Sequence, residues 1–294
     1  MDIAIPPVEP EVRARLEGRV MLLGVGAQKA GTSWLFKYLA ADPKIAASPL
    51  KELHFFSTWL SPRLFKGHDR AFLRMLAAAE APAARLLRAP RRLRALEERR
   101  TMMTDRAEYL RYFARRAGER RFLLEISPSY EILDVHRLRV VRRYFESAGV
   151  AVRPILLLRD PIERHYSALR MAQRDAKLAS AKSQFLPSLG FRSHVRHSRY
   201  DRTLRKLWSA FGEDAVSVAF YEHVTSTPEI HLRALVEGLG LDWRAPDLGA
   251  RVNASPRHAE LGEADVAAAL ELYRPVYDFV RANFGAETPA SWRA

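Results

Sequence analysis

The stretch that decides the fold is Val20-Met-Leu-Leu-Gly-Val-Gly-Ala-Gln-Lys-Ala-Gly-Thr-Ser-Trp-Leu35. Its first six residues are almost entirely apolar, which is typical of a strand that is buried on both faces. Small residues follow, and Thr32-Ser33 then opens a run with apolar residues at helical spacing. A loop between a buried strand and a helix N-terminus presents backbone N–H groups and the positive end of the helix dipole to an anion. The stretch therefore predicts a phosphate-binding loop in an α/β protein.

The position of the lysine distinguishes this loop from the one that nucleotide kinases and GTPases use. The spacing Gly26-x-x-x-x-Gly31-Thr32-Ser33 has the frame G-x-x-x-x-G-K-[ST], but no lysine follows the second glycine. Lys29 lies inside the loop instead, where it can contact the bridging oxygen of a short, doubly charged group without a metal. A nucleotide kinase or NTPase, the first alternative, needs Mg²⁺ ligands and a lysine at position 32.

The loop resembles the 5′-phosphosulfate loop of sulfotransferases that use 3′-phosphoadenosine 5′-phosphosulfate (PAPS). The pattern of that loop, G-x-x-K-x-G-T-[TS]-x-L, is matched completely by residues 26–35. The resemblance implies that Lys29 stabilises the charge on the leaving phosphate, while backbone N–H groups of residues 29–33 hold the 5′-phosphate. The loop residues implied in nucleotide binding are Gln28, Lys29, Ala30, Gly31, Thr32 and Ser33.

A second motif follows another predicted buried strand, residues 152–158. Asp160-Pro161 is a favourable start for a helix, so Arg159 is expected at the carboxyl end of a strand, where open α/β sheets bind ligands. The segment resembles the 3′-phosphate motif of the same sulfotransferases, L-R-[DN]-P-x-x-R-x-x-S. The resemblance implies that Arg159 supplies a bidentate fork and Ser167 a hydroxyl to the 3′-phosphate.

A third block reads Lys51-Glu-Leu-His-Phe-Phe56 and resembles a segment of the glycan-modifying branch of the family, heparan sulfate sulfotransferases included. The resemblance implies that Glu52 is the general base, because the acceptor hydroxyl or amine must lose a proton. In an extended segment His54 would point the same way, and it would orient the acceptor or be the base itself. The alternative is a solvated loop glutamate and a histidine packed on Phe55 and Phe56.

Two further segments resemble parts of the family's site. Residues 122–130 resemble E-K-[ST]-P-x-Y near the acceptor, but Ile126 replaces the lysine, which argues against a heparan-type acceptor geometry. The polar candidates that remain there are Glu125, Ser127, Ser129 and Tyr130. Residues 251–257 are polar and rich in turn formers, and in relatives a loop at this place closes over the nucleotide. The resemblance implies Arg257 as a second ligand of the 3′-phosphate, the alternative being a solvated arginine.

Composition limits the classes of function and of fold. The 294 residues are 48% hydrophobic and include no cysteine, so thiol chemistry and thiolate metal sites are excluded. None of the nine histidines forms an H-E-x-x-H pair, and no metal is expected. Strand and helix signals alternate, which favours one domain over residues 1–294 with a parallel sheet flanked by helices. Without a long apolar run or a signal-peptide pattern, a cytoplasmic location is expected.

The net charge of +14 is concentrated in an arginine-rich part, residues 60–121. Prolines at 82 and 90 divide its helical pattern, so we expect a helical insertion over 60–108 made of two or three short helices. Such a basic surface attracts anionic lipid headgroups, an anionic glycan or nucleic acid, against the alternative of a solvated face. Nucleic acid is disfavoured because no recognition motif accompanies the charge. Peripheral association with a membrane is therefore one of the expectations.

Together these segments predict a PAPS-dependent sulfotransferase with a phosphate-loop α/β fold. Lys29, Glu52 and His54 are the predicted catalytic residues, and adenosine 3′,5′-bisphosphate is the predicted product. The acceptor stays open between a glycan, a lipid headgroup and a small metabolite, as do O- or N-sulfation and the oligomeric state. A non-catalytic basic module that binds nucleotide or membrane is the second alternative, and it would leave Glu52 and His54 without a role.

Overall fold

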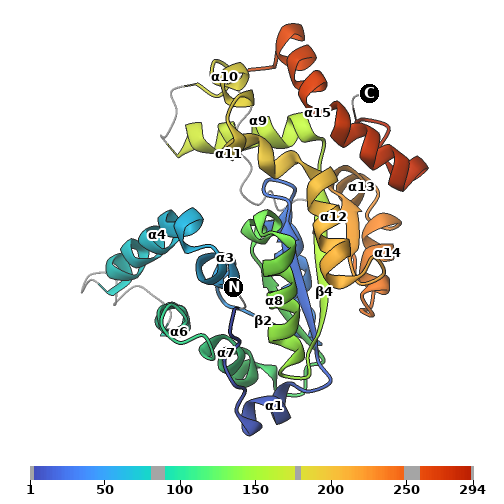
Figure 1. Ribbon diagram of the computed structural model, residues 1–294. Coiled ribbons are helices and arrows are strands. Elements are labelled where there is room, and N and C mark those ends of the chain that lie inside the picture. Colours follow the sequence, from blue (N-terminus) through green and yellow to red (C-terminus); the bar gives the residue numbers. More distant parts are fainter. Residues whose placement is uncertain (1–2, 81–89, 176–179, 248–258, 293–294) are drawn as a thin grey trace.

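A five-stranded parallel sheet forms the centre of the protein (Figure 1). The computed structural model describes residues 3–80, 90–175, 180–247 and 259–292. The strands lie in the order β2-β3-β1-β4-β5, and all neighbouring pairs are parallel. Their bounds are β1 Val20–Gly26, β2 Ile45–Ala47, β3 Phe122–Ile126, β4 Ala151–Leu158 and β5 Ser217–Phe220. The predicted fold class, a parallel sheet flanked by helices, is confirmed.

Strand β1 lies in the middle of the sheet because its side chains are apolar on both faces. Met21 to Gly26 are all buried, and β1 pairs with β3 on one side and with β4 on the other. Continuous burial of this kind is what a strand needs when helices cover both faces of a parallel sheet. The loop that follows β1 therefore emerges at the centre of the carboxyl edge.

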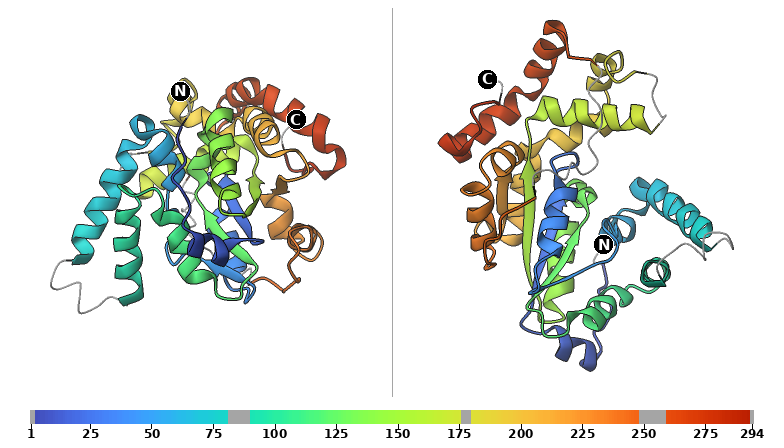
Figure 2. Two further views of the ribbon diagram at one scale, coloured as in Figure 1. Left: turned by 60° about the horizontal axis from the view of Figure 1, so that its bottom comes forward. Right: turned by 180° about the vertical axis from the view of Figure 1, so that it is seen from behind.

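Helices cover the two faces of the sheet. Helix α2 (Thr32–Ala40) packs on β2 and β3, while α8 (Val135–Glu146) and α12 (Tyr200–Phe211) pack on β4 and on each other on the opposite face (Figures 1 and 2). Helix α14 (His231–Gly238) packs on β5. This division follows from right-handed crossovers, because the chain moves one way across the sheet through α2 and the other way through α8.

Further helices gather beyond the carboxyl edge of the sheet, at the top of Figure 1. They are α9 (Pro161–Arg174), α10 (Phe185–Leu189), α11 (Arg192–Val195) and α15 (Glu263–Phe284). Three-residue and five-residue 3₁₀ turns, η1 (Pro128–Ile132), η2 (Arg196–Ser198) and η3 (Gly285–Glu287), complete the connections. The predicted helix start at Asp160 is confirmed, since its carboxylate accepts from the backbone N–H groups of Ile162 and Glu163.

The arginine-rich part is helical, as predicted, and only part of it stands away from the sheet (Figure 2). Its helices are α3 (Phe55–Leu60), α4 (Pro62–Glu80), α6 (Pro90–Thr101) and α7 (Glu108–Ala117). Helix α7 joins the main core and also packs on α1 (Pro10–Leu16). Helices α4 and α6 instead share a small core of their own, built on Leu76, Ala79 and Leu96. Whether the whole chain folds as one domain stays a prediction.

Two details complete the description of the fold. Strand β5 ends at Phe220, because Tyr221 begins helix α13 (Tyr221–Ser226). Pro275 lies inside helix α15. In the parts of the chain that the structure describes, no helix is both long and apolar enough to cross a bilayer.

Candidate active site

The phosphate-type loop lies between β1 and α2 in a conformation that requires its second glycine. Gly31 has a φ of 85°, and a Cβ there would lie 2.7 Å from the ring of Tyr221. Ala27 and Ala30 are fully buried, and the Ala27 N–H donates to the Leu157 carbonyl of β4 at 2.9 Å. The loop is thus held on the sheet by its alanines, and the helix N-terminus stays open toward the cleft.

Most of the charged side chains around Lys29 are cations. Its backbone carbonyl accepts a 3.0 Å hydrogen bond from Arg159 Nη1, and its side chain lines the cleft. Burial, followed by the charges of Arg174, Arg159 and Arg170, lowers the pKa of the Lys29 ammonium to about 8, although Asp175 acts in the opposite direction. An excess of positive charge of this kind favours an anion with more than one negative charge.

Arg159 and Ser167 line the same cleft as the loop, as the second motif predicts. The Tyr200 hydroxyl fixes the backbone of Arg159 by donating to its carbonyl at 2.8 Å. The guanidinium of Arg159 lies 4.8 Å from the centroid of the Tyr221 ring, which also covers Gly31. One tyrosine therefore holds both anion-binding elements in place. Arg164 of the same motif has another role, because it is buried and donates to Ser198 Oγ at 2.6 Å.

Glu52 and His54 come together, though not through an extended segment. Both residues have left-handed backbone, with φ values of 65° and 53°. The Glu52 N–H donates to the Ile126 carbonyl at 3.1 Å, and the His54 N–H donates to Ser127 Oγ at 3.0 Å. This curled loop brings His54 Nε2 to 3.4 Å from Glu52 Oε2. The two side chains were expected to point the same way in an extended segment; the segment is curled instead, and both side chains line the cleft.

The electrostatics of this pair keep Glu52 ionised. Burial raises its pKa, but the hydrogen bond from His54 and the ammonium of Lys51 outweigh burial and lower the pKa of Glu52 to about 2. His54 Nδ1 lies 2.8 Å from Ser129 Oγ, so both ring nitrogens have polar neighbours. Since the carboxylate is charged at neutral pH, it is able to accept a proton or to orient the imidazole.

Of the polar candidates named in residues 122–130, all of which the structure describes, only Ser129 lines the cleft. Glu125 is fully buried and accepts from the Tyr109 hydroxyl at 3.2 Å, while Tyr130 is buried among aromatic rings. Ser127 supports His54 from below, as its bond to the His54 N–H shows. Glu125 and Tyr130 are therefore structural. Arg257 lies outside the described residues.

Several residues at the site belong to no recognisable motif, so they could not be predicted from the sequence. They lie on α4, on α9 and on η2, and they are Phe65, His68, Arg170, Met171, Arg174, Arg196 and His197. The ring centroid of His68 lies 4.4 Å from that of His54, and burial together with His54 lowers the pKa of His68 to about 4. The arginine-rich insertion thus forms one wall of the cleft.

Arg99 of α6 connects this insertion to the Glu52–His54 loop. Its side chain is only 4% exposed, and its Nε donates to the carbonyl of Leu53, the residue between Glu52 and His54. Its Nη2 donates to Asp69 Oδ1 at 3.2 Å, one residue beyond His68. A buried guanidinium with these partners fixes the loop and α4 relative to each other.

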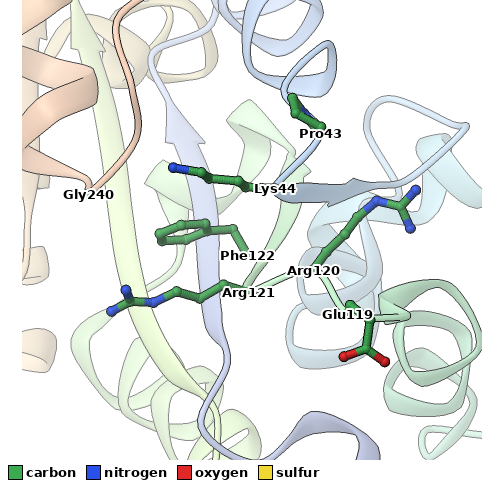
Figure 3. A pocket seen from close by; sticks show the side chains of 7 residues that line it. All are labelled: Pro43, Lys44, Glu119, Arg120, Arg121, Phe122 and Gly240. Carbon is green, nitrogen blue, oxygen red and sulfur yellow. The ribbon is translucent and has the colours of Figure 1, made fainter.

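The cleft as a whole has a volume of about 710 Å³ at the carboxyl edge of the sheet. A second cavity, about 640 Å³, lies at the opposite edge between Lys44, Arg121 and the turn at Gly240 (Figure 3). Lys44 there is engaged by Asp242 at 2.5 Å, and Arg121 lies over the Phe122 ring at 5.4 Å. Neither Lys29 nor Glu52 reaches it, so the predicted chemistry belongs to the first cleft. No three His, Cys, Asp or Glu side chains in the described ranges converge as a metal site.

A profile of the sulfotransferase family matches residues 22–245, a range that contains the loop, the Glu52–His54 pair and the Arg159 motif. The chain belongs to the sulfotransferase family. The match is to the family in general, so the predicted kinship with its glycan-modifying branch stays a prediction. Neither alternative, a nucleotide kinase or a non-catalytic basic module, gains support from it.

Solved structures agree with the family in their fold. A sulfotransferase from Alicyclobacillus acidocaldarius is 20% identical, with a TM-score of 0.66 over 94% of this chain and 99% of that one. The sulfotransferase domain of the Synechococcus PCC 7002 olefin synthase is 17% identical, with a TM-score of 0.51 over 94% of this chain and 98% of that domain. No curated protein matches the chain at a significant level.

Proposed function

We propose that this sulfotransferase takes the sulfuryl group from PAPS and passes it to a hydroxyl or amine of its acceptor. The observation that carries the proposal is the meeting of three elements in one cleft: the Lys29 loop, the Arg159–Ser167 motif and the Glu52–His54 pair. PAPS supplies an activated sulfuryl group whose leaving phosphate gains charge as the S–O bond breaks. The residues of the protein bind the donor, orient the acceptor and take up the proton that the acceptor loses.

The two ends of such a nucleotide match two groups of donors in the cleft. The backbone of residues 29–33 and the helix N-terminus suit the 5′-phosphate, because Gly31 leaves no side chain between them and a ligand. Lys29 suits the developing charge, since its lowered pKa reflects burial and then neighbouring cations, and an anion would offset both. Arg159 and Ser167 suit the 3′-phosphate. That no metal takes part stays a prediction.

We assign the role of general base to Glu52, with His54 orienting it. The Glu52 side chain is 39% exposed in the cleft, against 18% for His54. Both nitrogens of His54 already have neighbours, while Glu52 is free to exchange Lys51 for an acceptor hydroxyl. An anionic donor at Lys29 would raise the pKa of Glu52, because a nearby negative charge disfavours its ionised form. The carboxylate would thereby become a stronger base when the donor is bound.

The acceptor itself stays open between a glycan, a lipid headgroup and a small metabolite. The wall that faces Glu52 combines the rings of Phe65 and His68 with Arg196 and His197, so it offers both apolar and polar contacts. Histidine and arginine donors suit an acceptor with several hydroxyl or acidic groups. The cytoplasmic location and the absence of nucleic acid among the partners stay predictions as well.

The donor assignment is tested by calorimetry without metal, in the presence of a chelator. Adenosine 3′,5′-bisphosphate should bind far more tightly than adenosine 5′-monophosphate, and Arg159→Ala should narrow the difference by roughly 1.5–3 kcal/mol, the range for hydrogen bonds to charged groups. Arg153→Ala, at the exposed opposite end of β4, is the matched control and should leave the difference unchanged. Equal affinities of the unmutated protein for the two nucleotides would refute the assignment.

A further inference from the structure

The positive charge of the arginine-rich part is distributed unevenly among its helices. On α6 and α7 several arginines are paired with acids: Arg100 with Glu80, Arg111 with Glu9 and Asp105, and Arg115 and Arg116 with Glu98. On α4 the cations Arg63, Lys66, Arg70 and Arg74 are all exposed, and none forms an ion pair with any residue in the described ranges. Arg94 of α6, Arg120 and Arg121 are exposed and form no ion pair there as well, but α4 carries four such cations on one helix.

The four cations of α4 form a single stripe that points away from the protein. At about 100° per residue, they cover roughly 80° of the helix circumference, opposite the buried Phe65, Leu76 and Ala79. The stripe is about 16 Å long, because α-helices rise 1.5 Å per residue. Helix α4 lies at the edge of the molecule in every view, with α3 and α6 beside it (Figures 1 and 2). A flat, extended anionic partner is able to reach the whole stripe at once.

One exposed apolar side chain borders the stripe directly. Leu73, 43% exposed, lies about 20° from Lys66 around the helix, whereas Leu64 at 50% and Met75 at 39% lie about 80–100° beyond Arg74. A large exposed hydrophobic side chain beside cations is typical of helices that lie in a lipid interface. An anionic glycan or a nucleic acid would satisfy the cations and leave Leu73 in water.

We propose that α4 docks this protein onto the surface of an anionic lipid bilayer. The cations contact the headgroup phosphates, and Leu73 enters the interface beside them. Phe65 and His68 of the same helix line the cleft from the side of α4 opposite the stripe. Docking therefore leaves the cleft on the side of α4 that faces away from the bilayer.

The test is sedimentation with vesicles of phosphatidylcholine, with and without phosphatidylglycerol, in the absence of donor and acceptor. The unmutated protein should bind only the anionic vesicles, and binding should be lost between about 0.1 and 1 M salt as screening shortens from about 10 to 3 Å. The variant with Arg63, Lys66, Arg70 and Arg74 all changed to Gln should bind roughly 10³-fold more weakly, given the attraction of each cation near such a surface. Leu73→Ser should weaken binding several-fold while the charge is kept.

A control variant with the same net charge separates α4 from a general electrostatic attraction. It carries Gln at four other exposed cations: Arg15, Arg121, Lys182 and Arg202. It should bind vesicles as the unmutated protein does, and all variants should keep their affinity for adenosine 3′,5′-bisphosphate, which reports folding. Equal loss in the control and α4 variants would overturn the proposal, and so would unmutated protein that bound heparin but not the anionic vesicles. Because vesicle binding needs no turnover, its outcome is independent of the proposed reaction.

Discussion

Lys29 is the side chain whose environment says most about the ligand. Its backbone is left-handed, with a φ of 71°, so its position in the loop is set by the main chain rather than by a flexible stem. Burial and then the surrounding arginines disfavour its charge, and together they lower the pKa of Lys29 to about 8. A multiply charged anion would relieve this repulsion. Its binding is therefore more favourable because the cations repel one another when the site is empty.

Changing Lys29 to Ala should remove most turnover, because one preorganised cation is then missing where charge develops on the leaving phosphate. Loss of one such group typically lowers the rate by about 10²–10³. Lys37→Ala, on the exposed side of α2, is the matched control and should be close to the unmutated protein. Steady-state turnover with a verified acceptor checks both variants. Near-normal turnover of Lys29→Ala would show that the loop has another role.

The division of labour between Glu52 and His54 is also decided at single residues. Glu52→Gln keeps the shape of the side chain but removes the base, so turnover should fall by on the order of 10²–10⁴ while nucleotide affinity stays within about twofold. His54→Asn should be the milder change. Turnover and nucleotide affinity should be measured between about pH 5.5 and 9, which brackets the ordinary pKa of histidine. If only His54→Asn were inactive, the two roles would be exchanged, and if both were active the loop would be structural.

Helix α6 holds the Glu52–His54 loop against α4 through one buried side chain, Arg99. Arg99 donates to the Leu53 carbonyl and to Asp69. The carbon at the centre of its guanidinium lies 5.0 Å from the centroid of the Phe72 ring. Glu52 and His54 both have backbone that side chains rarely adopt, so their loop needs such support from outside. The insertion therefore supports the Glu52–His54 loop through α6 and lines the cleft through α4.

Arg99→Met should reduce turnover at least tenfold while nucleotide affinity stays within about twofold, because the loop moves and the Lys29 side of the cleft does not. It should also lower stability by roughly 3–5 kcal/mol, the cost of leaving one partner of a buried ion pair unpaired. Arg100→Met, exposed on the same helix, is the control. Arg99→Lys should restore part of the turnover. Equal losses of turnover and nucleotide affinity in Arg99→Met would point to general unfolding instead.

The elements that could be predicted are those whose cause is local. The β1 strand, the loop with Gly31 and the helix start at Asp160 follow from apolar runs, small residues and a capping side chain. The Glu52–His54 loop could not be predicted in detail, because its curled backbone depends on Ile126 and on Ser127, which are distant in sequence. His68 and Arg196 were missed for the same reason: only the assembled fold brings them to the cleft.

The buried histidine of α9 makes the folding stability of the whole protein depend on pH. His165 is fully buried, with Nδ1 2.6 Å from the Tyr273 hydroxyl and Nε2 2.9 Å from Ser188 Oγ. Burial and then Arg164 lower the pKa of His165 to about 2. The folded state thus keeps this imidazole neutral, while the unfolded chain takes up a proton below about pH 6.5. Stability should therefore fall as the pH decreases through that value.

The expected size of this effect is about 1.4 kcal/mol per pH unit below about pH 6.5, the value for one proton bound only by the unfolded state. Urea unfolding at pH 7, 6 and 5 measures it. His165→Gln retains polar atoms for Tyr273 and Ser188. The slope of its free energy of unfolding against pH should be smaller than that of the unmutated protein by the contribution of about one proton. This difference in slope is expected whatever the stability of the variant at pH 7. The same slope in both proteins would mean that other groups produce the acid sensitivity.

The central place of β1 has a consequence for the way the chain is made. β1 ends at Gly26, whereas its two neighbours begin at Phe122 and Ala151, so its partners are synthesised about 100 residues later. At about 5–20 residues per second, the apolar segment that leads into the Lys29 loop stays unpaired for roughly 5–20 s on the ribosome. During that interval it is a hydrophobic segment with free backbone groups. Expression of this protein should therefore depend on chaperones that shield the nascent chain until β3 and β4 have emerged.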